Sequence, residues 1–171
     1  KGDMTKLPKM KIKSFSKFLK FMQVLLKMSS LLSIKEPPEN DEATSVLLCK
    51  CYFYLLSSGI SQLNKLGHPA IHDWALKSPD RCYQWEVVGH PECTAYIRIK
   101  AGKSRAGRGA YKRAKPFFNM KFDCPTSALK ILLGTGDMFQ MTANQQLIME
   151  GGPEFGVQIG DYMMIVGDLA S

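Results

Sequence analysis

The chain has 171 residues, 45% of them hydrophobic, and a formal net charge of +8. This size suits one domain, or one domain with a helical extension, and the apolar content is sufficient for a buried core. The apolar runs look too short to span a bilayer, so we expect no transmembrane segment. The five cysteines form no CxxC pair, so neither a disulfide framework nor a zinc ribbon is suggested.

Residues 13–32 are predicted to form an amphipathic helix. Its apolar positions include Phe15, Phe18, Leu19, Met22, Leu25, Leu26 and Leu32, and its narrow polar stripe consists of Lys13, Lys17, Lys20, Gln23, Lys27 and Ser30. Nine lysines and one aspartate fall within residues 1–35, so this segment carries the whole net charge. Such a helix can lie on an anionic membrane, or pack as a helical hairpin or a dimer contact. The broad apolar face favours packing, because tertiary contacts usually stabilise amphipathic helices.

A second helix is predicted over residues 41–66, and a short third helix over residues 71–77 follows a Gly-His-Pro turn. His68 and His72 are four residues apart, a spacing at which two histidines on one helix face can share a metal. Because Pro69 falls at the expected helix start and no third ligand is identifiable, a turn and a helix cap are the favoured interpretation. A metal-dependent enzyme built on these histidines is the alternative.

Strand patterns begin at Tyr83. Residues 83–87 and 94–100 alternate between apolar and polar side chains around a Gly-His-Pro turn, which predicts a hairpin. A weaker, glycine-rich strand is expected at residues 103–109, and a fourth at residues 117–123. One face of the fourth strand consists of Phe118, Met120 and Phe122.

Helical spacing returns at Pro125, after a cap at Asp123 or Cys124. Two glycines in residues 134–136 end this helix, and Asp137 begins a second, short one. A last strand is predicted at residues 147–150, and a last helix at residues 153–168. The apolar face of the last helix consists of Phe155, Ile159, Tyr162, Met163 and Val166.

The second half of the chain resembles the sterol-carrier-protein type of lipid-binding domain. The segments that carry the resemblance are YQWEVVG, TAYIRIKAGK, FFNMKFDCPTSALKILLGTGD and LIMEGGPEFGVQIGDYMMIVG. The resemblance implies an α+β fold with a five-stranded, mainly antiparallel sheet covered by helices, over residues 80–171. Residues 1–79 would then form an α-helical N-terminal extension.

No catalytic constellation is recognisable, and the resemblance implies non-enzymatic binding or transfer of a fatty acid, acyl-CoA, sterol-like or other lipid. The ligand would lie in a hydrophobic tunnel between sheet and helices, with no cofactor. The expected wall residues are Phe118, Met120, Phe122, Phe139, Met141, Phe155, Ile159 and Met163. The absence of a disulfide pattern favours a reducing compartment, so a cytoplasmic location is expected.

Nine basic residues and no acidic one lie between Glu92 and Asp123. Such a run can bind phosphate, but alternating Lys and Arg also protect an edge strand from pairing with neighbours. We therefore expect no nucleic-acid partner and regard an anionic lipid headgroup as the better candidate. A homodimer through the N-terminal helices, or a protein-interaction module that docks through them, is the remaining alternative.

Overall fold

A computed structural model of the chain describes residues 15–38 and 40–170. The chain forms two compact units, residues 1–35 and residues 36–171, and each is described by itself. Lys13 of the predicted polar stripe lies outside the described residues.

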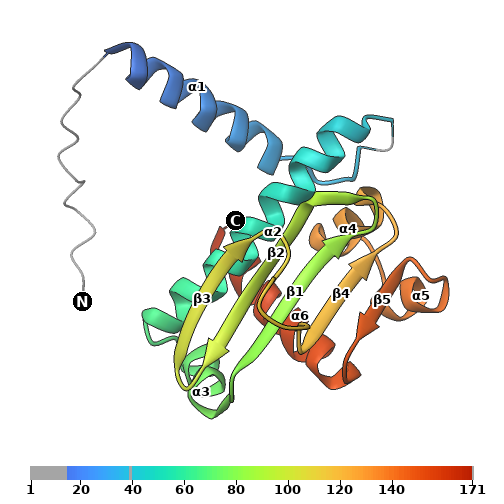
Figure 1. The fold of residues 1–171 in the computed structure, drawn as a ribbon. Helices are drawn as coiled ribbons and strands as arrows, with labels where there is room; N and C mark the ends of the chain where they lie inside the picture. The colour runs from blue at the N-terminus through green and yellow to red at the C-terminus, as the bar shows by residue number, and fades with distance from the viewer. Residues whose placement is uncertain (1–14, 39, 171) are drawn as a thin grey trace. The chain divides into compact units, whose positions relative to one another are not determined.

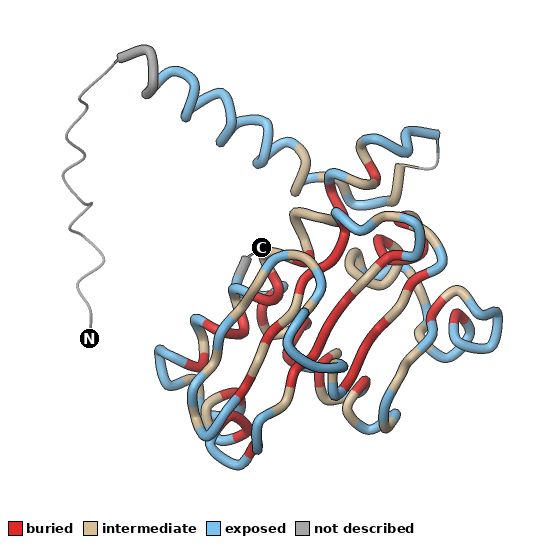
Figure 2. Tube along the Cα trace, in the orientation of Figure 1, coloured by how far each residue is buried: buried red, intermediate tan, exposed pale blue. Residues whose placement is uncertain are grey.

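The described part of the first unit contains helix α1 (Phe15–Leu32), which confirms the predicted helix. At its end, the Ser33 backbone N–H and hydroxyl both donate to the Ser29 carbonyl oxygen, at 3.1 and 2.8 Å. Every residue from position 19 to position 30 is exposed (Figure 2). The exposed large apolar side chains of this helix are Leu19, Phe21, Met22, Val24, Leu25, Leu26 and Met28.

The second unit is built on a five-stranded sheet in the order β3-β2-β1-β4-β5 (Figure 1). The strands are β1 (Arg81–Val87), β2 (His90–Lys100), β3 (Lys103–Arg108), β4 (Phe118–Phe122) and β5 (Leu147–Glu150). Neighbouring strands are antiparallel except for β1 and β4, which are parallel. The predicted α+β class with a mainly antiparallel five-stranded sheet is confirmed.

The described helices of this unit are α2 (Glu42–Lys65), α3 (Pro69–Lys77), α4 (Pro125–Leu132), α5 (Met138–Ala143) and α6 (Pro153–Ala170). Asp41 caps α2 by accepting the Thr44 N–H at 3.0 Å, and Asp137 caps α5 by accepting the Gln140 N–H at 2.9 Å. Caps of this kind stabilise a helix by about 1 kcal/mol. The other three helices begin at a proline, where the missing N–H has no intrahelical partner to lose.

The two faces of the sheet are covered differently. In Figure 1, α2, α3 and α6 lie behind the sheet, and the segment that joins edge strand β3 to β4 crosses in front of it. On this front face the Tyr111 N–H donates to Gln84 Oε1 at 2.8 Å, and the rings of Tyr96 and Tyr111 are 5.1 Å apart. The Tyr96 ring occupies the space where a Cβ at Gly107 would lie, so a side chain at position 107 would displace it. We call the opposite side of the sheet, which is covered by the helices, the inner face.

The second unit begins at Glu36 rather than near residue 80, because α2 and α3 pack against the sheet. The ring of Phe53 on α2 is 6.1 Å from that of Phe122, and the ring of Trp74 on α3 is 5.3 Å from that of Tyr83. The predicted boundary between a helical extension and a lipid-binding domain at residues 79 and 80 therefore falls inside one compact unit.

Helix α2 is long and apolar enough to cross a membrane when only length and composition are considered. The same properties are found in core helices of soluble proteins. Here Leu48, Phe53 and Ile60 of α2 are fully buried, and the rings of Phe53 and Phe122 approach each other. Its apolar character is therefore explained by its position against the sheet.

Candidate ligand-binding layer

Apolar side chains stand in rows across the inner face of the sheet. Strand pairing gives three rows, which are Ile97, Tyr83 and Phe118; Ala95, Trp85, Met120 and Met149; and Val87, Phe122 and Leu147. All except Met149 are at most 3% exposed. The sequence-predicted wall residues Phe118, Met120 and Phe122 therefore form one column along β4 on this buried face.

Helix α6 approaches this face closely at Gly156, which lies on its sheet side, and approaches α5 at Gly160. A Cβ at Gly156 would lie 2.5 Å from Met149 Sδ and 3.2 Å from Phe118 Cζ, and one at Gly160 would lie 3.5 Å from Met138 Cε. Two predicted wall residues of this helix are buried, Ile159 at 0% and Met163 at 8% exposure. Phe155 is partly exposed, and its ring is 4.7 Å from that of Phe117.

The two predicted wall residues of α5 lie in different surroundings. Met141 is 4% exposed, whereas Phe139 is 84% exposed and lies apart from the buried wall residues. A helix of six residues has fewer than two turns. Its sequence therefore defines no clear apolar face, and spacing alone could not decide which of these side chains points inward.

Tyr83 and Trp85 also belong to the inner face, although neither is among the wall residues expected from the sequence. The alternation of residues 83–87, read together with the pairing of β1 with β4, would have identified them. Burial raises the pKa of the Tyr83 phenol. Trp85 is 1% exposed, and its indole N–H has no hydrogen-bond partner among the described residues. A buried donor without a partner is uncommon in proteins.

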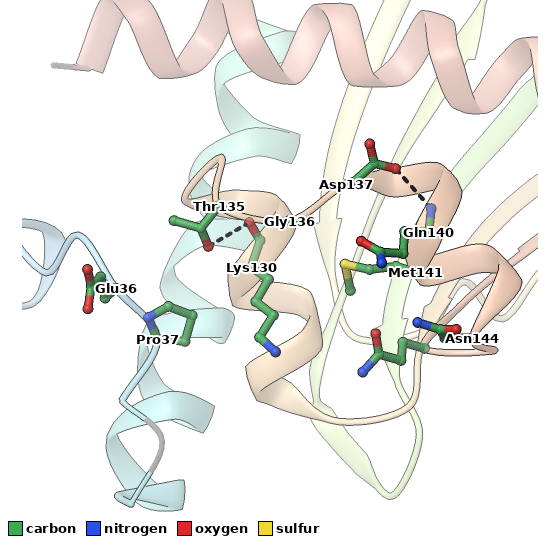
Figure 3. Close-up of a pocket in the computed structure, with 10 residues that line it drawn as sticks. Glu36, Pro37, Lys130, Thr135, Gly136, Asp137, Gln140, Met141 and Asn144 are labelled. Atoms are coloured by element: carbon green, nitrogen blue, oxygen red, sulfur yellow. Dashed lines mark hydrogen bonds between the residues drawn. The ribbon is translucent and has the colours of Figure 1, made fainter.

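A polar recess of about 690 Å³ lies at the α4–α5 end of this layer (Figure 3). It is lined by Glu36, Pro37, Lys130, Thr135, Gly136, Asp137, Gln140, Met141, Asn144 and Gln146. The turn after α4 is tight, since the N–H groups of Thr135 and Gly136 both donate to the Lys130 carbonyl oxygen at 2.9 Å. Met141 is at once a nearly buried residue and part of this lining.

Acidic side chains form ion pairs with some of the nine basic residues between Glu92 and Asp123. Lys121 Nζ lies 2.8 Å from Glu150 Oε1 and 3.4 Å from Glu86 Oε1. The hydrogen bond with Glu150 raises the pKa of Lys121 and lowers that of Glu150. Arg98 and Lys100 share the Asp80 carboxylate at 2.5 and 3.5 Å. These three cations are therefore occupied by intramolecular ion pairs.

The two histidines of the metal alternative lie at the start of α3 and in its first turn. His68 is the N-cap residue of α3 and precedes Pro69, as predicted. His72 Nδ1 lies 3.0 Å from Asn64 Oδ1, and Asn64 in turn donates to the Gly102 carbonyl oxygen at 3.0 Å. Across residues 15–38 and 40–170, no group of three or more His, Cys, Asp and Glu side chains is placed to hold a metal ion.

The five cysteines are free thiols. A hydrogen bond with Cys93, together with burial, raises the pKa of Cys49, and burial raises the pKa of Cys82 to about 12. Thiols with raised pKa values stay protonated at neutral pH and are poor nucleophiles. Neither residue has the properties of a catalytic cysteine.

A scan against protein-family models finds no match, and a search of curated proteins finds no similar sequence. Solved structures are similar to this chain at low identity. A ubiquinone synthesis protein, UbiJ-SCP2, is 18% identical over 68% of this chain and 96% of its own, with a TM-score of 0.39. Sterol carrier protein 2 is 12% identical over 66% of this chain and 90% of its own, with a TM-score of 0.41.

An alkylsulfatase, Pisa1 from Pseudomonas sp., is 18% identical over 55% of this chain, with a TM-score of 0.38. This chain spans only 14% of the sulfatase. The identities to these three structures are 18% or lower and the TM-scores are 0.41 or lower.

Proposed function

We propose that the second unit binds an elongated apolar molecule between the inner face of the sheet and α6, and transfers it without catalysing a reaction. The observation that carries the proposal is the position of Met141, which lines the polar recess and is itself only 4% exposed. A fatty acid, acyl-CoA or sterol-like lipid has this same combination of a polar end and a long apolar body.

The proposed wall consists of the predicted residues other than Phe139, together with Trp85 and Met149. Since most of these side chains are fully buried without a ligand, an entering chain has to displace some of them. Methionine suits this role, because its unbranched side chain adopts many shapes at low cost. Each methylene group buried on binding would contribute about 0.8 kcal/mol.

The polar end of the ligand is proposed to lie in the recess, beside Lys130 and the carboxamides of Gln140 and Asn144. Lys130 forms no ion pair within the described residues, so its ammonium group is available to a carboxylate or phosphate. The unpaired indole N–H of Trp85 could serve a ligand hydroxyl or carbonyl deeper in the layer. Five free thiols are consistent with a reducing location such as the cytoplasm.

Adjacent methionines on α6 provide the test. Met163 is 8% exposed and Met164 is 69% exposed. Met163→Glu would place a carboxylate against the bound chain, so uptake of a fluorescent fatty acid should fall at least tenfold, a loss of about 1.4 kcal/mol or more. Met164→Glu adds the same charge outside the layer and should change the affinity less than twofold.

Circular dichroism and thermal unfolding of both variants show whether the fold survives. A folded Met163→Glu protein that takes up the probe like the unsubstituted chain would contradict the proposed layer. Equal losses in both variants would place binding on the outer surface of α6.

A further inference from the structure

We propose that α1 is a docking helix for the surface of an anionic bilayer. The first observation is its exposed apolar face. Leu19, Phe21, Met22 and Leu25 are between 37% and 48% exposed, which is unusual for four large apolar residues within two helical turns.

The second observation is the arrangement of charge on the same helix. Lys20, Gln23, Lys27 and Ser30 follow one another at spacings of three and four residues, so they form one polar stripe opposite the large apolar side chains. Lysine at the border of an apolar face can extend its ammonium group to lipid phosphates while its methylene groups remain in the apolar region. This pattern is typical of helices that lie in the plane of the interface.

Charge also decides between a bilayer and a second copy of the chain. Residues 1–35 contain nine lysines and a single acidic residue, Asp3. A dimer through α1 would bring two such segments together and make them repel each other. An anionic bilayer would instead neutralise them, with a contribution of about 1 kcal/mol for each lysine near the surface. A length of roughly 27 Å for 18 residues suits a helix that lies on the surface.

The proposal can be tested with the full chain and vesicles of phosphatidylcholine, with or without phosphatidylserine. We expect sedimentation with the mixed vesicles at low salt, and much weaker binding to phosphatidylcholine alone. Lys20→Gln with Lys27→Gln should lower the affinity roughly 10- to 30-fold, and added salt should reduce the difference between this variant and the unsubstituted chain.

The apolar face is tested by Met22→Glu with Leu25→Glu, which should abolish binding to mixed vesicles. Val157→Glu with Met164→Glu on α6 is the matched control, because these residues are 56% and 69% exposed in the second unit. The control should retain most of the binding. Like the α1 variant, the α6 control removes two apolar side chains and adds two negative charges, but it leaves α1 intact.

Three results would overturn the proposal. The first is vesicle binding that the α1 substitutions do not change. The second is an equal loss in the α6 control. The third is analytical ultracentrifugation that shows a dimer dissociated by Met22→Glu with Leu25→Glu, since α1 would then bind a second copy. Thermal unfolding of the second unit should be the same in all variants, so a loss of fold cannot account for a loss of binding.

Discussion

Single residues mark the boundary between the polar and apolar parts of the candidate site. Met141 lines the recess and is nearly buried, and Lys130 stands beside it on α4. A Cβ at Gly136 would lie 2.9 Å from Met141 Sδ and 3.0 Å from Lys130 Cβ. Glycine at this position therefore lets the turn after α4 lie close to both side chains.

The role of Lys130 leads to a prediction that separates charge from apolar contact. Lys130→Gln should weaken binding of a fatty acid roughly fivefold, because a half-exposed ion pair is worth about 1 kcal/mol. Binding of the fatty alcohol of the same length should change little. Competition against a fluorescent probe measures both affinities.

Lys112→Gln is the control for that prediction, since Lys112 is an exposed lysine of the segment that crosses the front face of the sheet. It lowers the net charge equally but lies outside the recess, and should leave both affinities unchanged. Equal losses for acid and alcohol in Lys130→Gln would show that the lysine contributes packing rather than charge.

At the scale of elements, the candidate layer depends on how closely α6 approaches β4 and β5. Gly156→Ala would place a methyl group 2.5 Å from Met149 Sδ and 3.2 Å from Phe118 Cζ. Gly167→Ala, in the same helix, meets nothing within 4 Å. Alanine favours a helix over glycine by about 1 kcal/mol, so Gly167→Ala should stabilise the protein.

The two substitutions should differ, with Gly156→Ala less stable than Gly167→Ala by about 1 to 3 kcal/mol, the usual cost of overpacking. Urea-induced unfolding of each variant measures the difference in the free energy of unfolding. If Gly156→Ala stabilises the chain as much as Gly167→Ala does, the contact between α6 and the sheet is looser than described.

Most elements could be predicted from local patterns. The alternation at residues 83–87 and 94–100 predicted two strands, and Asp137 marked the start of a short helix. The structure confirms these elements. Strand order could not be predicted from the same signals, because the parallel pairing of β1 with β4 joins segments separated by two other strands. The resemblance to sterol-carrier domains supplied the five-stranded sheet as a whole.

The candidate site was predictable only in part, for the same physical reason. An apolar alternation identified Phe118, Met120 and Phe122 as one face of β4. The recess instead joins Glu36 and Pro37 to residues 130–146, which lie about a hundred positions later in the chain. Local spacing cannot predict such a contact, and it also placed Phe139 in the wall although its side chain is exposed.

At the scale of the whole molecule, the two compact units differ in where their apolar side chains lie. The first contains α1, which is apolar, basic and exposed, and the second contains the buried, methionine-rich layer. If both proposals hold, one unit attaches the chain to an anionic membrane and the other accepts a lipid from it. The two roles can be separated experimentally, because the residues that carry them do not overlap.

Methionine methyl groups allow the most direct measurement of the central claim, which is that a ligand enters the layer between the sheet and α6. We propose a titration of the full chain, labelled with 13C at the methionine methyl groups, with a long-chain fatty acid in NMR. The account predicts shifts, and contacts to the acyl chain, for Met120, Met141 and Met163, whereas Met164 should not change. Saturable shifts confined to Met22 and Met28 of α1, or no shifts at all, would contradict it.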